Sequence, residues 1–237
     1  MKTIRAPRAL GLDCAWEIKP ALAEWFASIG IRYAVRYIDR KYPGRGGPSW
    51  LDYLTRGELN ILLDAGLSVG VVQRAKFRGK DYLSSEYGRD MGRAAALNAT
   101  RLRLPSGVTV WCDAEWTDEP TATQIREYLN GWSSEVAREG YAPGLYVGAG
   151  CAPPMSPAQL YKLPRYKSYW QSVSQVSNVA TRGYCLVQSW EYVLRGTRPE
   201  TWRLETMTDS NKRKGPRFDL NMSHIDAKGG RWYVVGA

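Results

Sequence analysis

Two carboxylates on one short segment are the clearest sign of chemistry in this sequence. Residues 108–116 have the pattern of a β-strand, in which successive side chains point to opposite faces. One face carries only small apolar residues such as Cys112, whereas Asp113 and Glu115 share the other face. Their Cα atoms are therefore expected to lie about 7 Å apart. Glycoside hydrolysis needs such a pair, because one carboxyl must be protonated while the other is ionised.

Crowding two carboxylates in a partly dry site drives their pKa values apart, so that one of them becomes an acid near neutral pH. An Asp and a Glu in a surface loop just past a strand is the alternative interpretation, because the pattern is common. Other strand candidates favour the site, since their C-terminal ends carry polar or aromatic side chains on the face that we assign to the interior. With Asp113 and Glu115, we expect Asp13 to act in catalysis. The expected substrate-binding residues are Arg36, Gln73, Tyr146, Trp170, Gln188, Trp190 and Asp219.

The elements that would position these residues alternate between strands and helices. Helical segments are expected at 20–30, 55–66, 84–104 and 121–140, two of them opening on a capping box. Eight strands in such an alternation predict an α/β fold, a single (β/α)8 barrel over residues 1–237. Only residues 173–183 separate the last two strands before 190, so some helices of the C-terminal third are expected to be missing. The expected strands are 9–15, 31–38, 67–73, 108–115, 144–148, 168–172, 184–190 and 217–221.

The composition excludes several classes of metal and redox site. The 237 residues include a single histidine and four cysteines without a CxxC pair, which excludes zinc fingers, zincins and thioredoxin-like redox motifs. We therefore expect no metal, no cofactor and free thiols. No apolar run approaches the roughly 18 residues of a membrane helix, and no N-terminal stretch has the pattern of a secretory signal. The protein is expected to be a monomer, made in the cytoplasm and delivered to the cell wall by a phage lysis system, a virion or a secretion apparatus.

The net charge of +10 predicts an anionic partner. Many of the cations fall in segments 40–50, 74–80 and 195–217, which follow strands and would surround the mouth of a barrel. Peptidoglycan or another anionic glycan would be attracted to such a rim. Nucleic acid would be attracted equally by charge alone and is the less favoured partner. A solvated rim that only aids solubility is the structural alternative.

Several short motifs, in this order, resemble those of glycoside hydrolase family 25 lysozymes. They resemble still more closely the glycoside-hydrolase-like domain of unknown function DUF1906, the Rv2525c-like group. The resemblance extends over roughly residues 9–225, and its specificity comes from the order of the motifs. The motifs are Leu10-Gly-Leu-Asp13, Arg36-Tyr37, Leu54-Thr-Arg-Gly-Glu58, Trp111-Cys-Asp-Ala-Glu115, Gly144-Leu-Tyr146, Tyr169-Trp170-Gln171, Val187-Gln188 and Phe218-Asp-Leu-Asn221.

The resemblance implies cleavage of the β-1,4 bond after N-acetylmuramic acid in peptidoglycan. Glu115 would be the proton donor, and Asp113 would act as nucleophile or orient the acetamido group of the substrate. Asp13 and Asp219 would complete an acidic mouth. Many members of the unknown-function group keep only part of this acidic set, so a catalytically weak or inactive glycan-binding barrel is the alternative.

Overall fold

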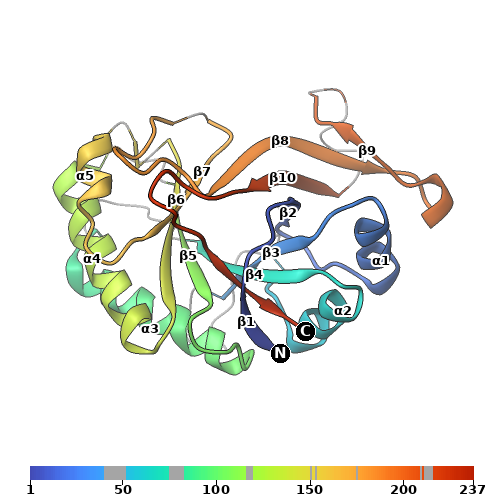
Figure 1. Cartoon of the computed structure of the whole chain (residues 1–237), viewed down its shortest axis with the longest axis horizontal. Helices are drawn as coiled ribbons and strands as arrows, with labels where there is room; N and C mark the ends of the chain where they lie inside the picture. The colour runs from blue at the N-terminus through green and yellow to red at the C-terminus, as the bar shows by residue number, and fades with distance from the viewer. Residues whose placement is uncertain are drawn as a thin grey trace.

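A closed barrel of eight β-strands forms the centre of the molecule (Figure 1). The computed structural model describes residues 1–39, 52–74, 83–115, 120–149, 151–152, 154–174, 176–208, 210 and 216–237, and of Trp190 only the backbone.

Seven barrel strands are parallel neighbours in chain order, and the eighth runs against them. The parallel strands are β2 (Leu10–Cys14), β3 (Tyr33–Ile38), β4 (Ser68–Arg74), β5 (Thr109–Ala114), β6 (Ala142–Val147), β7 (Ser168–Gln171) and β8 (Leu186–Arg195). The eighth strand, β10 (Arg217–Ser223), pairs antiparallel with both β8 and β2 and so closes the barrel. The sequence predicted eight strands at nearly these positions. It was wrong in treating the last one as parallel.

Helices cover the early strands and are sparse later, in agreement with the short spacing near residue 180. Thr55 and Thr121 accept a backbone N–H at the starts of the second and fourth helices, as the capping patterns predict. No helix is present in the described residues between β7 and β8, so the barrel is α/β but not a complete (β/α)8 fold. The helices are α1 (Pro20–Ser28), α2 (Arg56–Asp64), α3 (Ser85–Arg101), α4 (Ala122–Arg138) and α5 (Pro157–Tyr161).

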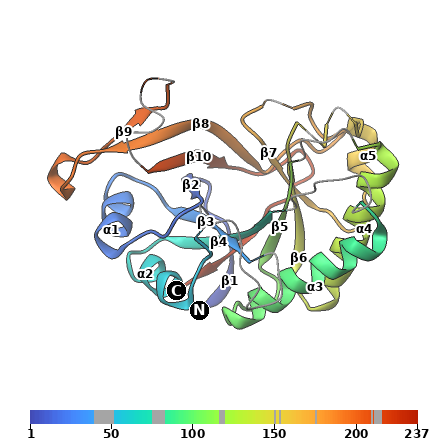
Figure 2. The same cartoon turned by 180° about the vertical axis from the view of Figure 1, so that it is seen from behind.

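Three further strands were not predicted. β11 (Tyr233–Gly236) pairs with the start of β4, and β1 (Lys2–Arg5) pairs with β11. β9 (Arg203–Thr206) pairs only with β8, and a short 3-10 turn, η2 (Pro199–Thr201), precedes it. Figures 1 and 2 both show this hairpin extending beyond the barrel above α1. Each of these strands has only four residues, which is too short to give a clear strand pattern.

Aromatic rings fill the end of the barrel where the parallel strands begin. Trp232, just before β11, packs on Tyr33 at 5.2 Å and on Trp111 at 5.6 Å between ring centroids. A Cβ atom at Gly70 would lie 2.6 Å from the ring of Trp232, and one at Gly144 would lie 2.5 Å from that of Trp111. The barrel is therefore a packed core at this end, and a cavity has room only at the other end.

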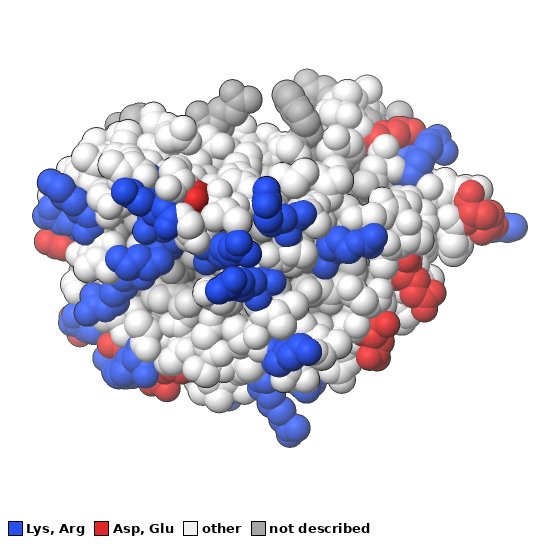
Figure 3. Space-filling view, in the orientation of Figure 1, with Lys and Arg blue, Asp and Glu red and all other residues white. Residues whose placement is uncertain are grey.

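Two expectations from composition can be compared with the described residues. All four cysteines are buried and free. Among the helices that the structure describes, none combines the length and the apolar character needed to cross a bilayer. Figure 3 shows that Lys and Arg side chains form a broad band across one face of the molecule, whereas most Asp and Glu side chains of that face lie toward its edges.

Candidate active site

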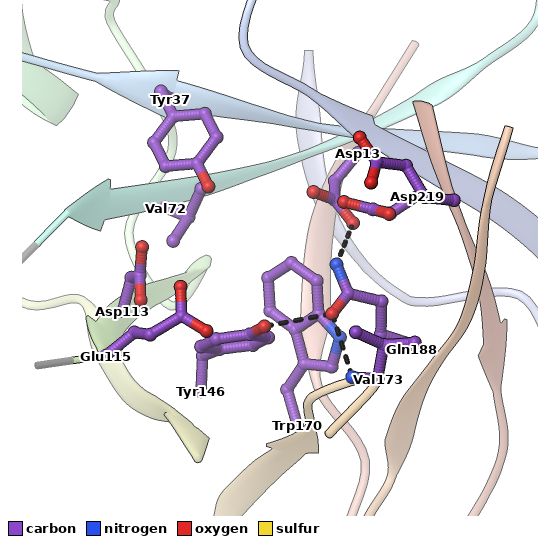
Figure 4. Close-up of a pocket in the computed structure, with 11 residues that line it drawn as sticks. Asp13, Tyr37, Val72, Asp113, Glu115, Tyr146, Trp170, Val173, Gln188 and Asp219 are labelled. Atoms are coloured by element: carbon purple, nitrogen blue, oxygen red, sulfur yellow. Dashed lines mark hydrogen bonds between the residues drawn. The ribbon is translucent and has the colours of Figure 1, made fainter. Parts of the chain in front are cut away.

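A cavity of about 220 Å³ lies at the C-terminal ends of the parallel strands (Figure 4). Its walls are rich in carboxylates, which come from β2, β5, β8 and β10 and from the residue just beyond β5. The lining residues are Asp13, Tyr37, Val72, Asp113, Glu115, Tyr146, Trp170, Val173, Gln188, Glu191 and Asp219.

The Asp113–Glu115 pair forms one side of this cavity. Asp113 is the fifth residue of β5 and is held between Arg74 of β4 and Tyr146 of β6 by the parallel register. Its side chain is buried and its Oδ1 has no hydrogen-bond partner, whereas Glu115 is exposed at the mouth. Burial, and next the charge of Glu115, raise the pKa of Asp113 to about 8, against the opposing effect of Arg74. Asp113 therefore keeps a proton at neutral pH.

Asp13 and Asp219 face this pair from the opposite wall (Figure 4). They are register partners on β2 and β10. Oδ2 of Asp13 accepts hydrogen bonds from Nδ2 of Asn221 at 2.6 Å and Nε2 of Gln188 at 3.3 Å. Burial raises the pKa of both aspartates; the two hydrogen bonds lower that of Asp13, and the charge of Asp13 further raises that of Asp219. This wall therefore contains two carboxyl groups that resist ionising together.

Gln188 connects the wall that contains Asp13 to the aromatic floor of the cavity. Its Oε1 accepts hydrogen bonds from the Tyr146 hydroxyl at 2.9 Å and from the backbone N–H of Val173 at 3.0 Å, so its Nε2 must face Asp13. The ring of Tyr146 packs edge-on against Trp170 at 4.7 Å. The indole Nε1 of Trp170 is buried and has no hydrogen-bond partner. The floor is thus a closely packed pair of aromatic rings.

Of the ten residues that the sequence selected, the structure brings seven together around the cavity. For Trp190 the side chain lies outside what the structure describes. The seven are Asp13, Asp113, Glu115, Tyr146, Trp170, Gln188 and Asp219.

Arg36 and Gln73 lie on the outer face of the barrel, which corrects the sequence interpretation. Paired residues in a sheet share a face, and the register pairs Arg36 with Cys14 and Gln73 with Cys112. Both cysteines lie in the hydrophobic core that the barrel shares with the helices. Gln73 accordingly accepts a hydrogen bond from Nε1 of Trp132 at 2.7 Å. A polar residue at a strand end can face outward, and the register with the neighbouring strand decides which face it occupies.

Asp219 reaches the cavity for a different reason from the one expected. Because β10 is antiparallel, the start of this strand, not its end, lies beside the C-terminal ends of the other strands. The prediction of the residue was therefore right in position although the strand direction was wrong.

Glu191 is a cavity residue that the sequence analysis missed. The pairing of β8 with β10 slips between Gln188 opposite Asn221 and Glu191 opposite Asp219, so β8 has one extra residue there. Such a bulge reverses the alternation of side chains and turns Glu191 inward. Nothing in the sequence alone marks the bulge. Tyr37 is a second cavity residue that the sequence analysis missed. It follows Arg36 on β3 and therefore faces the other side of the strand, and an aromatic side chain near the end of a strand was the signal that could have found it.

A second cavity of about 210 Å³ adjoins the first, sharing Asp13, Tyr37, Glu191 and Asp219 with it. Its remaining walls include Trp16 and Arg217. Nε1 of Trp16 donates to the carbonyl of Arg217 at 2.9 Å, and the ring packs edge-on against Phe218. The acidic residues thus lie at the junction of two hollows.

Much of the predicted cationic rim lies outside the described residues, namely segments 40–50 and 75–80 and residues 212–214. In the described part, no group of three or more His, Cys, Asp or Glu side chains has an arrangement that could hold a metal ion.

Comparisons with solved structures agree with the barrel. The chain is similar to the Tat-secreted protein Rv2525c of Mycobacterium tuberculosis, solved with L-tartrate, with 18% identity, a TM-score of 0.64, and coverage of 95% of this chain and 100% of that one. A B. stearothermophilus protein described as uncharacterized gives 16% identity, a TM-score of 0.55, and 91% and 95% coverage. A glycosyl hydrolase 25 of Streptococcus pneumoniae gives 14% identity, a TM-score of 0.52, and 90% and 86% coverage. These likenesses concern the fold.

No curated protein matches the sequence. The family model of the Rv2525c-like, glycoside hydrolase-like domain matches residues 23–221, a span that includes most of the barrel and every cavity residue except Asp13. The chain belongs to the family of Rv2525c-like, glycoside hydrolase-like domains.

Proposed function

We propose that this protein is a glycosidase that cleaves a β-1,4 bond beside an N-acetylated sugar, in peptidoglycan or a related anionic glycan of the cell wall. The observation that carries the proposal is the buried Asp113 carboxyl, which has an unpartnered oxygen and lies beside the exposed Glu115 in an acidic cavity. A carboxyl placed in this way has a strongly perturbed pKa, as catalytic acids require.

The two acids act as a pair that shares one proton. The charge of Glu115 and burial both raise the pKa of Asp113, so at neutral pH the proton rests on the buried Asp113. As the glycosidic bond breaks, the proton of the pair passes to the leaving oxygen through Glu115 at the mouth, and the ionised Asp113 stabilises the positive charge on the sugar ring. Water then bonds to the anomeric carbon and returns a proton to the pair.

The opposite wall positions the sugar. Trp170 and Tyr146 form the aromatic floor of the cavity, against which a sugar ring can pack. Asp13 is held by Asn221 and Gln188 in one orientation. The second hollow beside Trp16 gives the next sugar of a polymer a place to lie, so the substrate is a chain and not a single sugar.

Glu115→Gln tests the proposal by removing a proton donor while keeping the shape of the side chain. Clearing of purified cell wall is expected to fall by about 10²- to 10⁴-fold, with no change in thermal unfolding. Glu127→Gln, an exposed glutamate of α4, is the matched control and should keep full activity. An activated aryl glycoside, whose leaving group needs little protonation, should recover part of the loss in Glu115→Gln.

Two results would count against the proposal. Clearing that persists in Glu115→Gln would remove Glu115 as the donor. Binding of cell wall without any turnover by the unmodified chain would instead identify a glycan-binding barrel that has lost catalysis.

A further inference from the structure

A second charged surface lies away from the acidic cavity. Between Glu139 and Glu191 the sequence contains no aspartate or glutamate. Cations of this stretch meet others from the turn before β11. We call these six residues the basic surface: Lys162, Arg165, Lys167, Arg182, Lys228 and Arg231.

Hydrogen bonds hold the three segments of the basic surface together. Arg182 donates from Nη1 to Oδ2 of Asp226 at 2.7 Å and to the carbonyl of Lys167 at 3.0 Å. Oδ1 of Asp226 accepts the backbone N–H groups of Lys228 at 2.9 Å and Gly230 at 2.7 Å. The one carboxylate of these segments is thus buried and already used. The cations are presented on an ordered framework, so little conformational entropy is lost when they bind.

The outer cations of this surface are free to meet a partner. Lys162, Arg165, Lys167 and Lys228 are exposed, and so is Tyr161, which is 40% exposed and precedes Lys162 in the chain. A hydrogen bond to Thr181, and then the charges of Lys228, Arg182 and Lys167, lower the pKa of the Tyr161 hydroxyl. Four cations held near one another repel, and nothing in the fold requires them. Such a cluster therefore indicates a binding role.

The topology places the basic surface at the opposite end of the barrel from the cavity. Lys167 and Arg182 precede β7 and β8, at the end where the parallel strands begin, and residues 224–232 connect β10 to β11 at the same end. The acids of the cavity lie where the parallel strands finish. A polymer on the basic surface would therefore leave the cavity open.

We propose that the basic surface binds an anionic polysaccharide and holds the protein on its glycan matrix. Guanidinium and ammonium groups spaced over several segments suit a chain of repeated carboxylates. Single-stranded nucleic acid is favoured by several stacking aromatic rings, and a membrane surface by exposed apolar residues. Among the described residues of 161–167, 181–183 and 226–231, Tyr161 is the only large hydrophobic side chain that is well exposed. Binding here does not depend on the proposed hydrolysis.

Binding of polygalacturonate to the full chain tests this site, because it is anionic and lacks the N-acetylated sugar of the proposed substrate. The test variant carries Lys162→Gln, Arg165→Gln, Lys167→Gln and Lys228→Gln, and it spares Arg182, which supports the fold. The control variant removes the same charge elsewhere, by glutamine at the exposed Arg8, Arg101, Arg103 and Arg126. The test variant should bind about tenfold or more weakly, and the control should lose less than about threefold.

The dependence on salt and the choice of polymer sharpen the result. Binding by the unmodified chain should weaken steeply between 50 and 200 mM salt, and neutral dextran should not bind. Equal losses in the two variants would overturn the site, since only net charge would then matter. Tighter binding to oligo(dT), or to vesicles with anionic lipid, lost in the test variant alone, would overturn the choice of partner. Near-ultraviolet circular dichroism verifies that both variants are folded.

Discussion

Buried charges are paired on the outer face of the barrel wall, whereas on its inner face buried carboxyl groups lie beside one another. On the outer face, Arg36 and Glu58 are both fully buried and form an ion pair of 2.6 Å. Arg36 also donates to the carbonyl of Cys14, and Glu58 accepts the backbone N–H of Ile18. On the inner face, Asp13 and Asp113 are buried beside other carboxyl groups, and the burial raises the pKa of each.

The difference separates a structural role from a chemical one. A buried ion pair with its hydrogen bonds in place adds little net stability, because the attraction between the charges is largely offset by the cost of removing them from water. The Arg36–Glu58 pair does, however, fix the position of α2 against β3. A buried carboxyl crowded by like charges keeps a proton that it can give away near neutral pH. Arg36 was expected in the cavity because of its type and position. Its saturated hydrogen bonding marks it as structural.

The largest expected effect breaks the outer pair. Glu58→Gln leaves the Arg36 guanidinium buried without its counter-charge, which should lower the free energy of unfolding by about 3–5 kcal/mol. The measurement is urea unfolding at pH 7. The double variant Arg36→Met with Glu58→Leu removes both charges and should lose less than Glu58→Gln alone. A smaller loss in the single variant than in the double would contradict the view of a satisfied pair.

The next effect concerns the inner face and has the opposite sign. The pKa of Asp113 rises from an ordinary value near 4 to about 8 on folding. Between these values the unfolded chain releases the proton and the folded chain keeps it, so stability due to Asp113 falls as the pH rises. Asp113→Asn cannot ionise, so at pH 8 its free energy of unfolding should be higher than that of the unmodified chain, by up to about 5 kcal/mol.

Urea unfolding of both proteins at pH 4, 6 and 8 measures this difference, which should nearly vanish at pH 4. The same difference at all three pH values would show that Asp113 is ionised in the fold. The matched control is Asp64→Asn, at the last residue of α2, where the exposed side chain should give no such dependence.

These residues also show how far the sequence could reach. Alternation along a strand identified Asp113 and Glu115, and capping patterns identified α2 and α4, because both signals depend on near neighbours in the chain. Register between strands, the antiparallel direction of β10 and the bulge before Glu191 depend on partners far away in sequence. That is why Arg36 and Gln73 were placed on the wrong face and why Glu191 was missed.

A third prediction concerns the wall that faces Asp113. Asn221→Leu keeps much of the volume but removes the 2.6 Å hydrogen bond to Oδ2 of Asp13. Because that bond lowers the pKa of Asp13, the variant should raise it by about one unit. Carbon-13 NMR of the aspartate carboxyls follows the titration. An unchanged titration of Asp13 would mean that the weaker contact with Gln188 is sufficient to orient this carboxyl.

The smallest effect should come from Arg217, the described cation that lines the second hollow beside Glu191. The Arg217 side chain is 57% exposed and its Nη1 lies 3.4 Å from Oε1 of Glu191, so water and salt screen its charge.

Arg217 lowers the pKa of Asp219. Arg217→Gln should therefore raise that pKa by less than about half a unit at low salt, and the shift should disappear near 0.5 M salt. Arg198→Gln, at an exposed arginine beyond the end of β8 that is absent from the cavity lining, should leave the pKa of Asp219 unchanged. A large shift that survives salt would instead mean that Arg217 acts as a buried partner of Asp219. The inner face would then resemble the outer one, with its charge balanced and its proton no longer available for catalysis.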